Sequence, residues 1–173
     1  MYLAFSDGAC KGNPGPGGWG CVVESPNAEI WERRGNKLLT TNNQMELSGA
    51  IEALRLTPLG STVQVTTDSQ YVIKGITEWM PGWLRRGWKS STGGDVKNKD
   101  LWVLLDAEVR LRQVEWAWVR GHTGHPQNER CDELANLGVA ELSLQAASTG
   151  PIVLQTHKIK ADPARGIDIL FEL

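Results

Sequence analysis

The spacing of apolar residues changes near residue 43, and this change constrains the fold more than any other feature. Before it, apolar and β-branched runs at about 2–7, 19–23 and 29–39 are separated by turn-forming residues. Short runs joined by turns are typical of strands that pair with the next strand along the chain. The first part of the sequence therefore predicts an antiparallel meander of three strands.

After residue 43, helical and strand patterns alternate. Apolar residues between Leu47 and Leu54 recur at helical spacing, and Asn42 or Asn43 is placed to cap that helix. The later patterns are a strand at 62–67, helices at about 69–79 and 101–111, a strand at 114–119 and a helix at 129–142. Because a strand followed by a crossover helix implies parallel pairing, we expect an α/β fold. Its mixed sheet should have five strands, three antiparallel and then parallel, with helices on both faces.

Length and composition favour one domain and exclude several classes of protein. The chain has 173 residues and 40% hydrophobic content, enough for one substantial core but not for two full domains. Its net charge of -2 predicts no basic field over the whole molecule, so binding of nucleic acid must rely on a local patch. Cys10, Cys21 and Cys131 form no CxxC pair, and no apolar stretch approaches the roughly 20 residues of a membrane span. We expect a monomeric cytoplasmic protein with reduced thiols and no membrane contact.

Four carboxylates occupy positions at which strands end or helices begin. Asp7 and Asp68 end the first and fourth strand patterns, while Glu46 and Asp132 fall in the first turns of two helices. Each alone has a structural explanation: an N-cap for Asp68, a capping box for Glu46 and a favourable helix dipole for Asp132. If the two strands are neighbours, however, Asp7 and Asp68 lie side by side. Clustered carboxylates of this kind favour Mg²⁺ or Mn²⁺ over zinc.

Two further segments carry distinctive residues. The glycine-rich segment 12–18 lacks the Gly-Lys-Ser/Thr ending of a P-loop, so we interpret it as a wide turn between two strands. The segment 81–102 has five Lys or Arg side chains against two Asp, with tryptophans among them. This segment predicts a local basic patch, although the net charge of the whole chain is negative. We expect Trp102, Trp116 and Trp118 to belong to the core.

Six short motifs, in order, resemble the signature of type 1 ribonucleases H. They are Ser6-Asp-Gly-Ala-Cys10, Gly12-Asn-Pro-Gly-Pro-Gly-Gly-Trp-Gly20, Thr41-Asn-Asn-Gln-Met-Glu-Leu47, Thr67-Asp-Ser-Gln-Tyr71, Gly121-His-Thr-Gly-His-Pro126 and Asn128-Glu-Arg-Cys-Asp-Glu-Leu-Ala135. The similarity runs from about Tyr2 to Leu142, and six motifs in the right order make chance a poor explanation. The resemblance implies a ribonuclease H-like fold, in agreement with the patterns above, and a catalytic domain at 1–142.

The resemblance also implies an activity and its catalytic residues. The protein would be an endonuclease that hydrolyses the RNA strand of an RNA/DNA hybrid and leaves 5′-phosphate and 3′-hydroxyl ends. Two Mg²⁺ ions, for which Mn²⁺ substitutes, would be held by Asp7, Glu46, Asp68 and Asp132, with Asp7 bridging them. His122 would assist proton transfer or product departure. A lone histidine in a polar loop is usually only solvated, so the motif around His122 carries this assignment.

The same resemblance assigns residues to the substrate. Thr41 and Asn98 match a pocket for a DNA phosphate. Leu39 departs from the family pattern, which often has arginine there, so we expect a weaker pocket. Contacts to the 2′-hydroxyl would select RNA. The RNA strand is assigned to Cys10, Gly12, Asn13, Gln70 and Glu46, both strands to Asn42 and Asn43, and a basic protrusion to Trp79, Arg85, Arg86, Trp88 and Lys89.

Other functions and the role of the tail stay open at this point. A non-catalytic hybrid-binding module on the same fold would be expected to lack part of the carboxylate set, which is complete here. A different nuclease or integrase is not expected to combine the basic protrusion with the histidine-containing loop motif. In the tail, 143–173, apolar runs at 152–154 and 167–173 predict an extra strand or pair of strands. Alternatively, Leu170-Phe171 resembles the ending of sliding-clamp-binding peptides, which would make the tail a contact for a replication protein.

Overall fold

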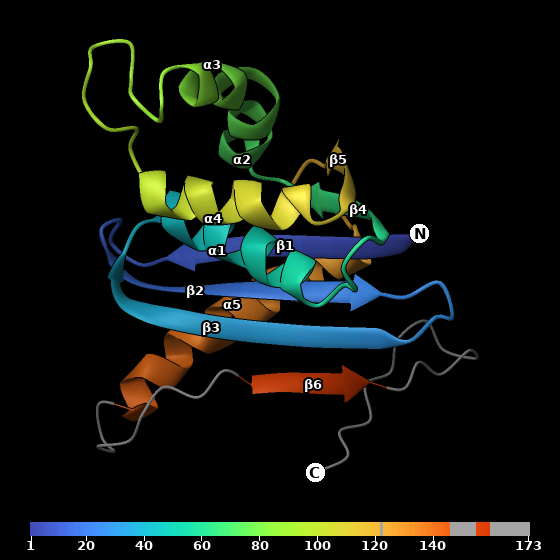
Figure 1. The fold of residues 1–173 in the computed structure, drawn as a ribbon. Coiled ribbons are helices and arrows are strands. Elements are labelled where there is room, and N and C mark those ends of the chain that lie inside the picture. The colour runs from blue at the N-terminus through green and yellow to red at the C-terminus, as the bar shows by residue number, and fades with distance from the viewer. Residues whose placement is uncertain (122, 146–154, 160–173) are drawn as a thin grey trace.

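The protein, described by a computed structural model, is built on one mixed β-sheet (Figure 1). The structure describes residues 1–121, 123–145 and 155–159. Across the sheet the strand order is β5-β4-β1-β2-β3-β6. The elements are β1 (Tyr2–Cys10), β2 (Gly15–Glu24), β3 (Ile30–Thr40), α1 (Asn42–Arg55), β4 (Thr62–Thr67), α2 (Gln70–Lys74), the π-helical turn η1 (Gly75–Trp79), α3 (Met80–Arg85), α4 (Lys99–Arg110), β5 (Gln113–Trp118), α5 (Pro126–Gln145) and β6 (Gln155–Ile159). No helix in the described ranges has the length and apolar character needed to cross a membrane.

The first three strands form the antiparallel meander that the sequence predicts. β1 pairs with β2, and β2 pairs with β3, both in antiparallel register. The interpretation of 12–18 as a turn is wrong for its second half. β2 already begins at Gly15, and Gly17 and Gly18 pair with residues of β1. The physical reason lies in helix α5, which packs on this part of β2.

Helix α5 lies directly on glycines of β2. A Cβ atom at Gly18 would overlap the carbonyl oxygen of Ala135, and one at Gly20 would lie 2.5 Å from the carbonyl oxygen of Cys131. Any larger residue would therefore force the helix and the sheet apart. Since Asp132 lies between these two helical positions, the same glycines fix how far its backbone stands from the sheet.

β4 and β5 extend the sheet in parallel orientation. β1 pairs with β4 so that Ser6 lies opposite Thr67, and β4 pairs with β5. Asp7 and Asp68 directly follow this pair, so they lie side by side where the pairing of β1 with β4 ends. β1 itself continues to Cys10 and still pairs with β2 there, so the prediction that Asp7 ends the first strand is wrong. The prediction that the first and fourth strands are neighbours is confirmed.

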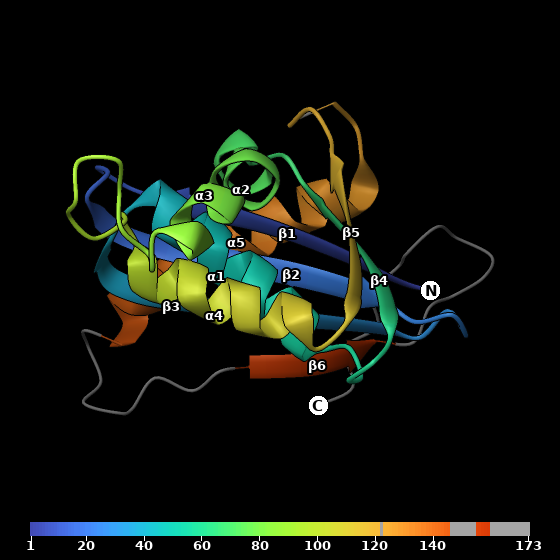
Figure 2. The same ribbon diagram turned by 45° about the horizontal axis from the view of Figure 1, so that its top comes forward.

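Helices cover both faces of the sheet, with α1 and α4 on one face and α5 on the other (Figure 2). Two helix starts differ from the predictions. Thr41, rather than either predicted asparagine, caps α1, because its hydroxyl accepts a hydrogen bond from the backbone N–H of Gln44 at 3.3 Å. α5 begins at Pro126, so Asp132 lies in its second turn rather than its first.

The larger part of the core lies between the sheet and α1 and α4. Trp102 is fully buried there, as predicted, and Trp116 is partly buried against the same cluster. Full burial of a large apolar side chain stabilises a fold by roughly 1.5–3 kcal/mol. The prediction for Trp118 is wrong, since its side chain is 47% exposed. β5 is an edge strand with one neighbour, so its last residue has no second strand to cover it.

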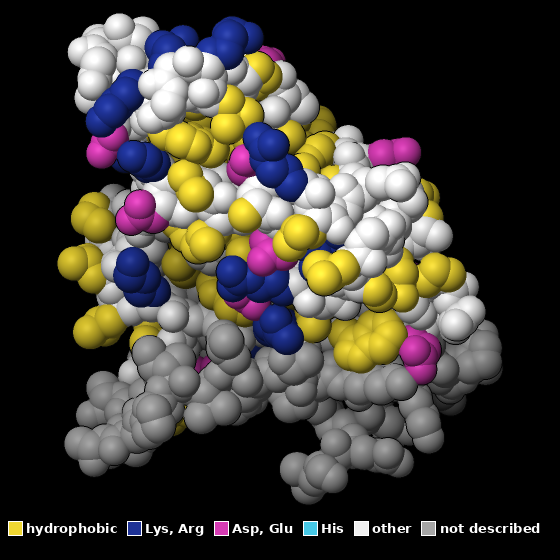
Figure 3. All heavy atoms as spheres, viewed as in Figure 1, with side chains coloured by type: hydrophobic (Ala, Val, Ile, Leu, Met, Phe, Trp, Pro, Cys, Tyr) yellow, Lys and Arg dark blue, Asp and Glu magenta, His cyan; other side chains and the backbone are white. Residues whose placement is uncertain are grey.

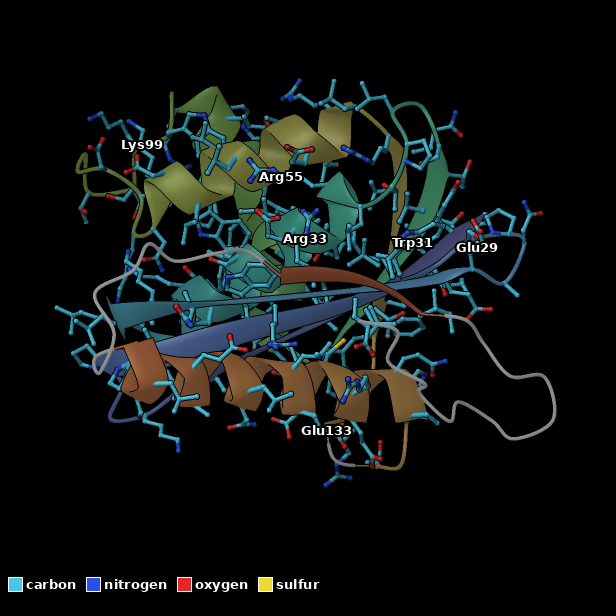
Figure 4. All side chains as sticks on the ribbon, turned by 90° about the horizontal axis from the view of Figure 1, so that it is seen from below. Glu29, Trp31, Arg33, Arg55, Lys99 and Glu133 are labelled. Carbon is cyan, nitrogen blue, oxygen red and sulfur yellow. The ribbon has the colours of Figure 1, made fainter. Side chains whose placement is uncertain are left out.

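A line of ion pairs joins β3 to α1 and α4. Glu52 accepts from Arg33 at 2.8 Å and from Arg55 at 2.8 Å, and Arg55 also pairs with Glu108 at 2.9 Å. Figure 4 shows Arg33 and Arg55 on one side of the sheet and Glu133, on α5, on the other. Such partly exposed pairs contribute only about 0.2–1 kcal/mol each. Their main effect is to fix how the two helices sit on β3.

A sixth strand from the tail lies along β3. β6 pairs antiparallel with β3, with Gln155 opposite Arg34 and Ile159 opposite Ile30. The sheet thus has six strands among the described residues, one more than predicted, and an extra tail strand agrees with one of the two expectations for the tail. The apolar runs at 152–154 and 167–173 lie outside the described residues. β6 itself was not predicted because an open edge recruits a strand through backbone hydrogen bonds, which need no apolar pattern.

Candidate active site

Three of the four predicted carboxylates meet where β4 ends beside β1. Asp7 comes from β1, Asp68 directly follows β4, and Glu46 comes from the second turn of α1 rather than the predicted first turn. One oxygen from each of them lies within 4.8 Å of the other two. We call these three residues the carboxylate cluster. The side-by-side placement of Asp7 and Asp68 follows from the parallel register of β1 and β4, in which Ser6 lies opposite Thr67.

The structural explanations for these residues do not hold. Ser69, not Asp68, caps α2, since the Ser69 hydroxyl accepts from the backbone N–H of Val72 at 3.2 Å. The cap of α1 is Thr41, and Glu46 lies too far into the helix to complete a capping box with it. The carboxylates are therefore not explained by the need to cap helices.

Burial of the carboxylate cluster disfavours the ionised form of its carboxyl groups. Asp7 and Glu46 are 6% and 5% exposed. The pKa of Asp7 is raised to about 7, first by burial and then by the negative charge of Asp68. Burial and the charge of Asp7 also raise the pKa of Glu46. Glu46 Oε2 is buried and has no hydrogen-bond partner among the described residues. Carboxylates arranged in this way need either a proton or a cation.

Asp68 is held from two directions. The indole N–H of Trp118 donates to its backbone carbonyl at 3.0 Å, and Asn128 Nδ2 donates to its Oδ2 at 3.4 Å. Gly121 approaches the same carboxylate so closely that a Cβ atom there would overlap it. Asn128 is not among the site residues predicted from the sequence. A signal was present, because Asn128 precedes Asp132 by one helical turn and so shares its face of α5.

Asp132 stands apart from the other three carboxylates. It is half-buried, and its Oδ1 accepts a hydrogen bond from Asn136 Nδ2 at 3.1 Å. The group with ligand oxygens within 4.8 Å of one another does not include it. Its negative charge nevertheless contributes to the raised pKa of Asp7, which shows that it faces the same region. Its role as a fourth metal ligand stays a prediction.

The predicted proton-transfer residue, His122, lies outside the described residues. Gly121, the residue before it, is described and lies against the Asp68 carboxylate. The catalytic role of His122 stays a prediction.

Several predicted substrate residues gather beside the carboxylate cluster. Asn13 Oδ1 accepts from the backbone N–H of Asn42 at 2.9 Å, which joins the loop after β1 to the start of α1. The thiol of Cys10, at the end of β1, donates to the carbonyl oxygen of Thr40 at 3.4 Å. Gly12 lies in the same loop with a φ of 81°. Gln70 is exposed and begins α2, two residues after Asp68, and Asn43 is half-buried in the first turn of α1.

The predicted basic protrusion stands above α4 and consists of α3 and the loop that follows it (Figure 1). Figure 3 shows Lys and Arg side chains gathered over this part of the surface. Arg85 and Arg86 are exposed, and Lys89 forms an ion pair with Asp95 at 2.6 Å. Trp88 is half-buried with a φ of 64°, and Trp79 is 36% exposed. The prediction of a local basic patch in an acidic chain is confirmed.

A cavity of about 660 Å³ lies between the end of β3, α1 and the start of α4. Asn98 lines it, as the predicted phosphate pocket requires. Thr41 does not line it, because its hydroxyl caps α1, and the neighbouring Thr40 is found there instead. Two lysines, Lys37 and Lys99, and two aspartates, Asp95 and Asp100, also line the cavity, so it carries charges of both signs. Lys99 pairs with Asp95 at 3.4 Å.

Comparison with known proteins identifies the family. The RNase H family model matches residues 1–140. The chain is 56% identical over 142 residues to a Ribonuclease H of Dechloromonas aromatica (strain RCB), which covers 80% of this chain and 93% of that protein. It is 54% identical over 144 residues to Ribonuclease HI of Pseudomonas aeruginosa (strain PAO1), with coverage of 82% and 95%. The crystal structure of a type 1 RNase H with the type 2 active-site motif matches with a TM-score of 0.73 at 36% identity, covering 81% of this chain and 72% of that chain. This protein therefore belongs to the RNase H family.

Proposed function

We propose that the protein hydrolyses the RNA strand of RNA/DNA hybrids in a metal-dependent reaction centred on the carboxylate cluster. The observation that carries this proposal is the unpartnered Oε2 of Glu46 beside two further carboxylates. A carboxylate oxygen that is buried without a partner is costly, and a divalent cation would offset that cost. Membership of the RNase H family supports the substrate class.

The donor set fits a hard divalent cation. All three residues of the described cluster offer carboxylate oxygens, which suit Mg²⁺ and Mn²⁺. The residues proposed to hold two Mg²⁺ ions, or Mn²⁺ in their place, are Asp7, Glu46, Asp68 and Asp132. When bound, such ions lower the pKa of an attacking water and stabilise a leaving oxygen. Products with 5′-phosphate and 3′-hydroxyl ends are expected.

The residues around the carboxylate cluster hold its side chains in place. Asn128 and Trp118 fix Asp68, so that its carboxylate needs little rearrangement when a ligand arrives. Asp7, between Glu46 and Asp68, is the candidate for a shared ligand. His122, which directly follows Gly121 in the sequence, would take or give a proton at the cleaved bond.

Recognition of the hybrid would come from the residues beside the cluster. Cys10, Asn13 and Gln70 lie near the strand ends and offer small polar groups of the kind that contact a 2′-hydroxyl. Arg85 and Arg86 are exposed, and phosphates attract cationic side chains irrespective of sequence. Arg86 Nε donates to the carbonyl oxygen of Lys89 at 3.1 Å, which leaves its other N–H groups for a phosphate. Specificity and affinity are thus assigned to different parts of the surface.

The test is cleavage of a labelled RNA/DNA hybrid, compared with duplex RNA and duplex DNA, in Mg²⁺ and in EDTA. We expect cleavage of the hybrid but of neither duplex, and we expect it in Mg²⁺ but not in EDTA. Asp68→Asn, which keeps the volume of the side chain and removes its charge, should abolish cleavage while hybrid binding is retained. Glu115→Gln, which also removes one negative charge, at an exposed position of β5, is the matched control and should cleave normally.

Calorimetric titration of Mg²⁺ into the free protein adds a measurement that does not depend on activity. Weaker Mg²⁺ binding is expected for Asp68→Asn and not for Glu115→Gln. Cleavage of the hybrid by Asp68→Asn at the wild-type rate would refute the assignment of the cluster. A wild-type protein that binds the hybrid and Mg²⁺ without cleaving would indicate a non-catalytic hybrid-binding module instead.

A further inference from the structure

The hydroxyl of Tyr71 joins segments that are far apart in the sequence. Tyr71 lies on α2, three residues after Asp68. Its oxygen accepts hydrogen bonds from Asn98 Nδ2 at 3.0 Å and from Trp102 Nε1 at 3.1 Å. Tyr71 is not a member of the carboxylate cluster and has no part in the proposed reaction.

Asn98 is held by both ends of its amide. It precedes α4 with a φ of 59°, in the left-handed region, and its side chain does not cap the helix. Gln44 Nε2 donates to Asn98 Oδ1 at 3.2 Å, and Asn98 Nδ2 donates to Tyr71. An amide has two N–H groups and two lone pairs on its oxygen. One N–H and one lone pair are therefore left for a ligand in the cavity that Asn98 lines.

The hydrogen bonds continue beyond Asn98 to the end of β3. Thr40 Oγ1 donates to Gln44 Oε1 at 2.8 Å, so the line runs from Thr40 through Gln44 and Asn98 to Tyr71. Linked hydrogen bonds polarise and order one another. The direction of the remaining N–H of Asn98 is thus set by Gln44 on one side and by Tyr71 on the other.

The ring of Tyr71 extends the same junction to the basic protrusion. Its centroid lies 5.8 Å from that of Trp79 in an edge-on arrangement, and 5.3 Å from that of the fully buried Trp102. These are favourable aromatic geometries. Tyr71 therefore contacts one predicted substrate residue, Asn98, through its hydroxyl and another, Trp79, through its ring.

We propose that Tyr71 is a positioning residue for substrate binding, which acts through Asn98 on the DNA strand of the hybrid. This inference rests on the proposed function, since it takes the hybrid as the substrate. A donor that is already oriented loses less conformational entropy when it binds a phosphate. Loss of the Tyr71 hydroxyl weakens the binding of the hybrid and leaves the chemical step at saturating substrate unchanged.

Tyr71→Phe removes the hydroxyl and keeps both ring contacts. We expect KM for the hybrid to rise about two- to tenfold, the change that loss of one ordinary hydrogen bond produces, with kcat within about twofold of wild type. The dependence of the dissociation constant on salt should keep its slope, because a neutral amide releases no counterion. Tyr2→Phe, the same change at the only other tyrosine of the chain, is the matched control and should alter neither constant.

A double-mutant cycle separates positioning from general loosening of the fold. Asn98→Ala should raise KM, and adding Tyr71→Phe to it should raise KM no further. Since Trp102 also loses its acceptor in Tyr71→Phe, thermal unfolding is measured first and the kinetics are run well below the lowest midpoint. If Tyr71→Phe does not fold, Gln44→Met removes the donor on the other side of Asn98 and should produce the same rise in KM.

The outcomes distinguish this inference from the proposed function. An unchanged KM in Tyr71→Phe overturns the inference, as does an equal rise in KM with and without the Asn98 side chain. A wild-type protein that cleaves no hybrid refutes the proposed function itself, whatever the variants do.

Discussion

Replacing Asp7 by Asn should stabilise the metal-free protein at alkaline pH. The pKa of Asp7 is about 7 in the folded protein, against an ordinary value of 3.8, chiefly because of burial. Folding therefore favours the protonated carboxyl, and this contribution is fully present below about pH 4 and is lost as the pH rises through about 7. A difference of about 3 pKa units sets a ceiling of about 4 kcal/mol at pH 8. In the wild type the backbone N–H of Gly8 donates to Asp7 Oδ1, and the amide oxygen of Asn can accept the same hydrogen bond.

Because Asp7 and Glu46 influence each other, we expect about half of this ceiling, about 2 kcal/mol, to appear as a gain in Asp7→Asn. Urea unfolding in EDTA measures it as the difference in the free energy of unfolding between variant and wild type, near zero at pH 4 and positive at pH 8. Asp100→Asn makes the same charge change at an exposed helix start, where an acidic residue is favourable, and should give no gain.

Divalent cations should reverse the order of stability. Mg²⁺ at about 100 times its dissociation constant should stabilise the wild type by about 2.7 kcal/mol, and Asp7→Asn by much less. A difference in the free energy of unfolding between variant and wild type in EDTA that stayed the same from pH 4 to pH 8 would show that burial does not raise the pKa of Asp7.

Three further predictions concern the proposed site and the tail. His122→Ala should lower turnover by about 10- to 100-fold and change the shape of the pH profile, because general acid–base assistance supplies part of the rate; an unaltered rate and profile from pH 6 to 9 would leave the histidine without a role. Neutralising Arg85, Arg86 and Lys89 together should weaken hybrid binding and reduce the magnitude of the salt slope by about two to three, at roughly 0.7–0.9 for each phosphate contact; the same slope in the triple variant would show that the protrusion does not touch phosphates. Removing 146–173 should leave metal-dependent cleavage intact and lower the melting temperature by several degrees, because β3 loses its pairing with β6; a folded but inactive product would contradict the assignment of function to the first part of the chain.

The parts of the site that depend on strand order could be predicted from the sequence. Asp7 and Asp68 are the first acidic residues after two runs with a strand pattern. The parallel pairing of those two strands follows from the crossover helix between them. The family motifs then indicated Glu46. Local sequence patterns do not give the distances between side chains. They therefore could not show that Asp132 lies outside the carboxylate cluster.

The contacts that support the site could not be predicted in this way. Asn128 reaches Asp68 across 60 residues, and Tyr71 reaches Asn98 across 27. Such pairings are decided by how helices pack on the sheet and leave no periodic trace. The prediction that Trp118 is buried was wrong for a related reason. Its burial depends on whether β5 has a second neighbouring strand, and composition does not reveal which strand lies at an edge.

The contact between α5 and the glycines of β2 has a consequence for engineering this protein. Where a helix rests on a layer of side chains, that layer can be repacked, and a change of one methylene is absorbed by small shifts of its neighbours. At Gly18 and Gly20 the main chain of β2 instead meets the main chain of α5, and the side chains of Phe5, Val22 and Leu134 pack beside this contact. The distance of Asp132 from the sheet is thus set by backbone contact, so repacking the core on the opposite face should leave it unchanged, whereas any larger residue at either glycine should change it.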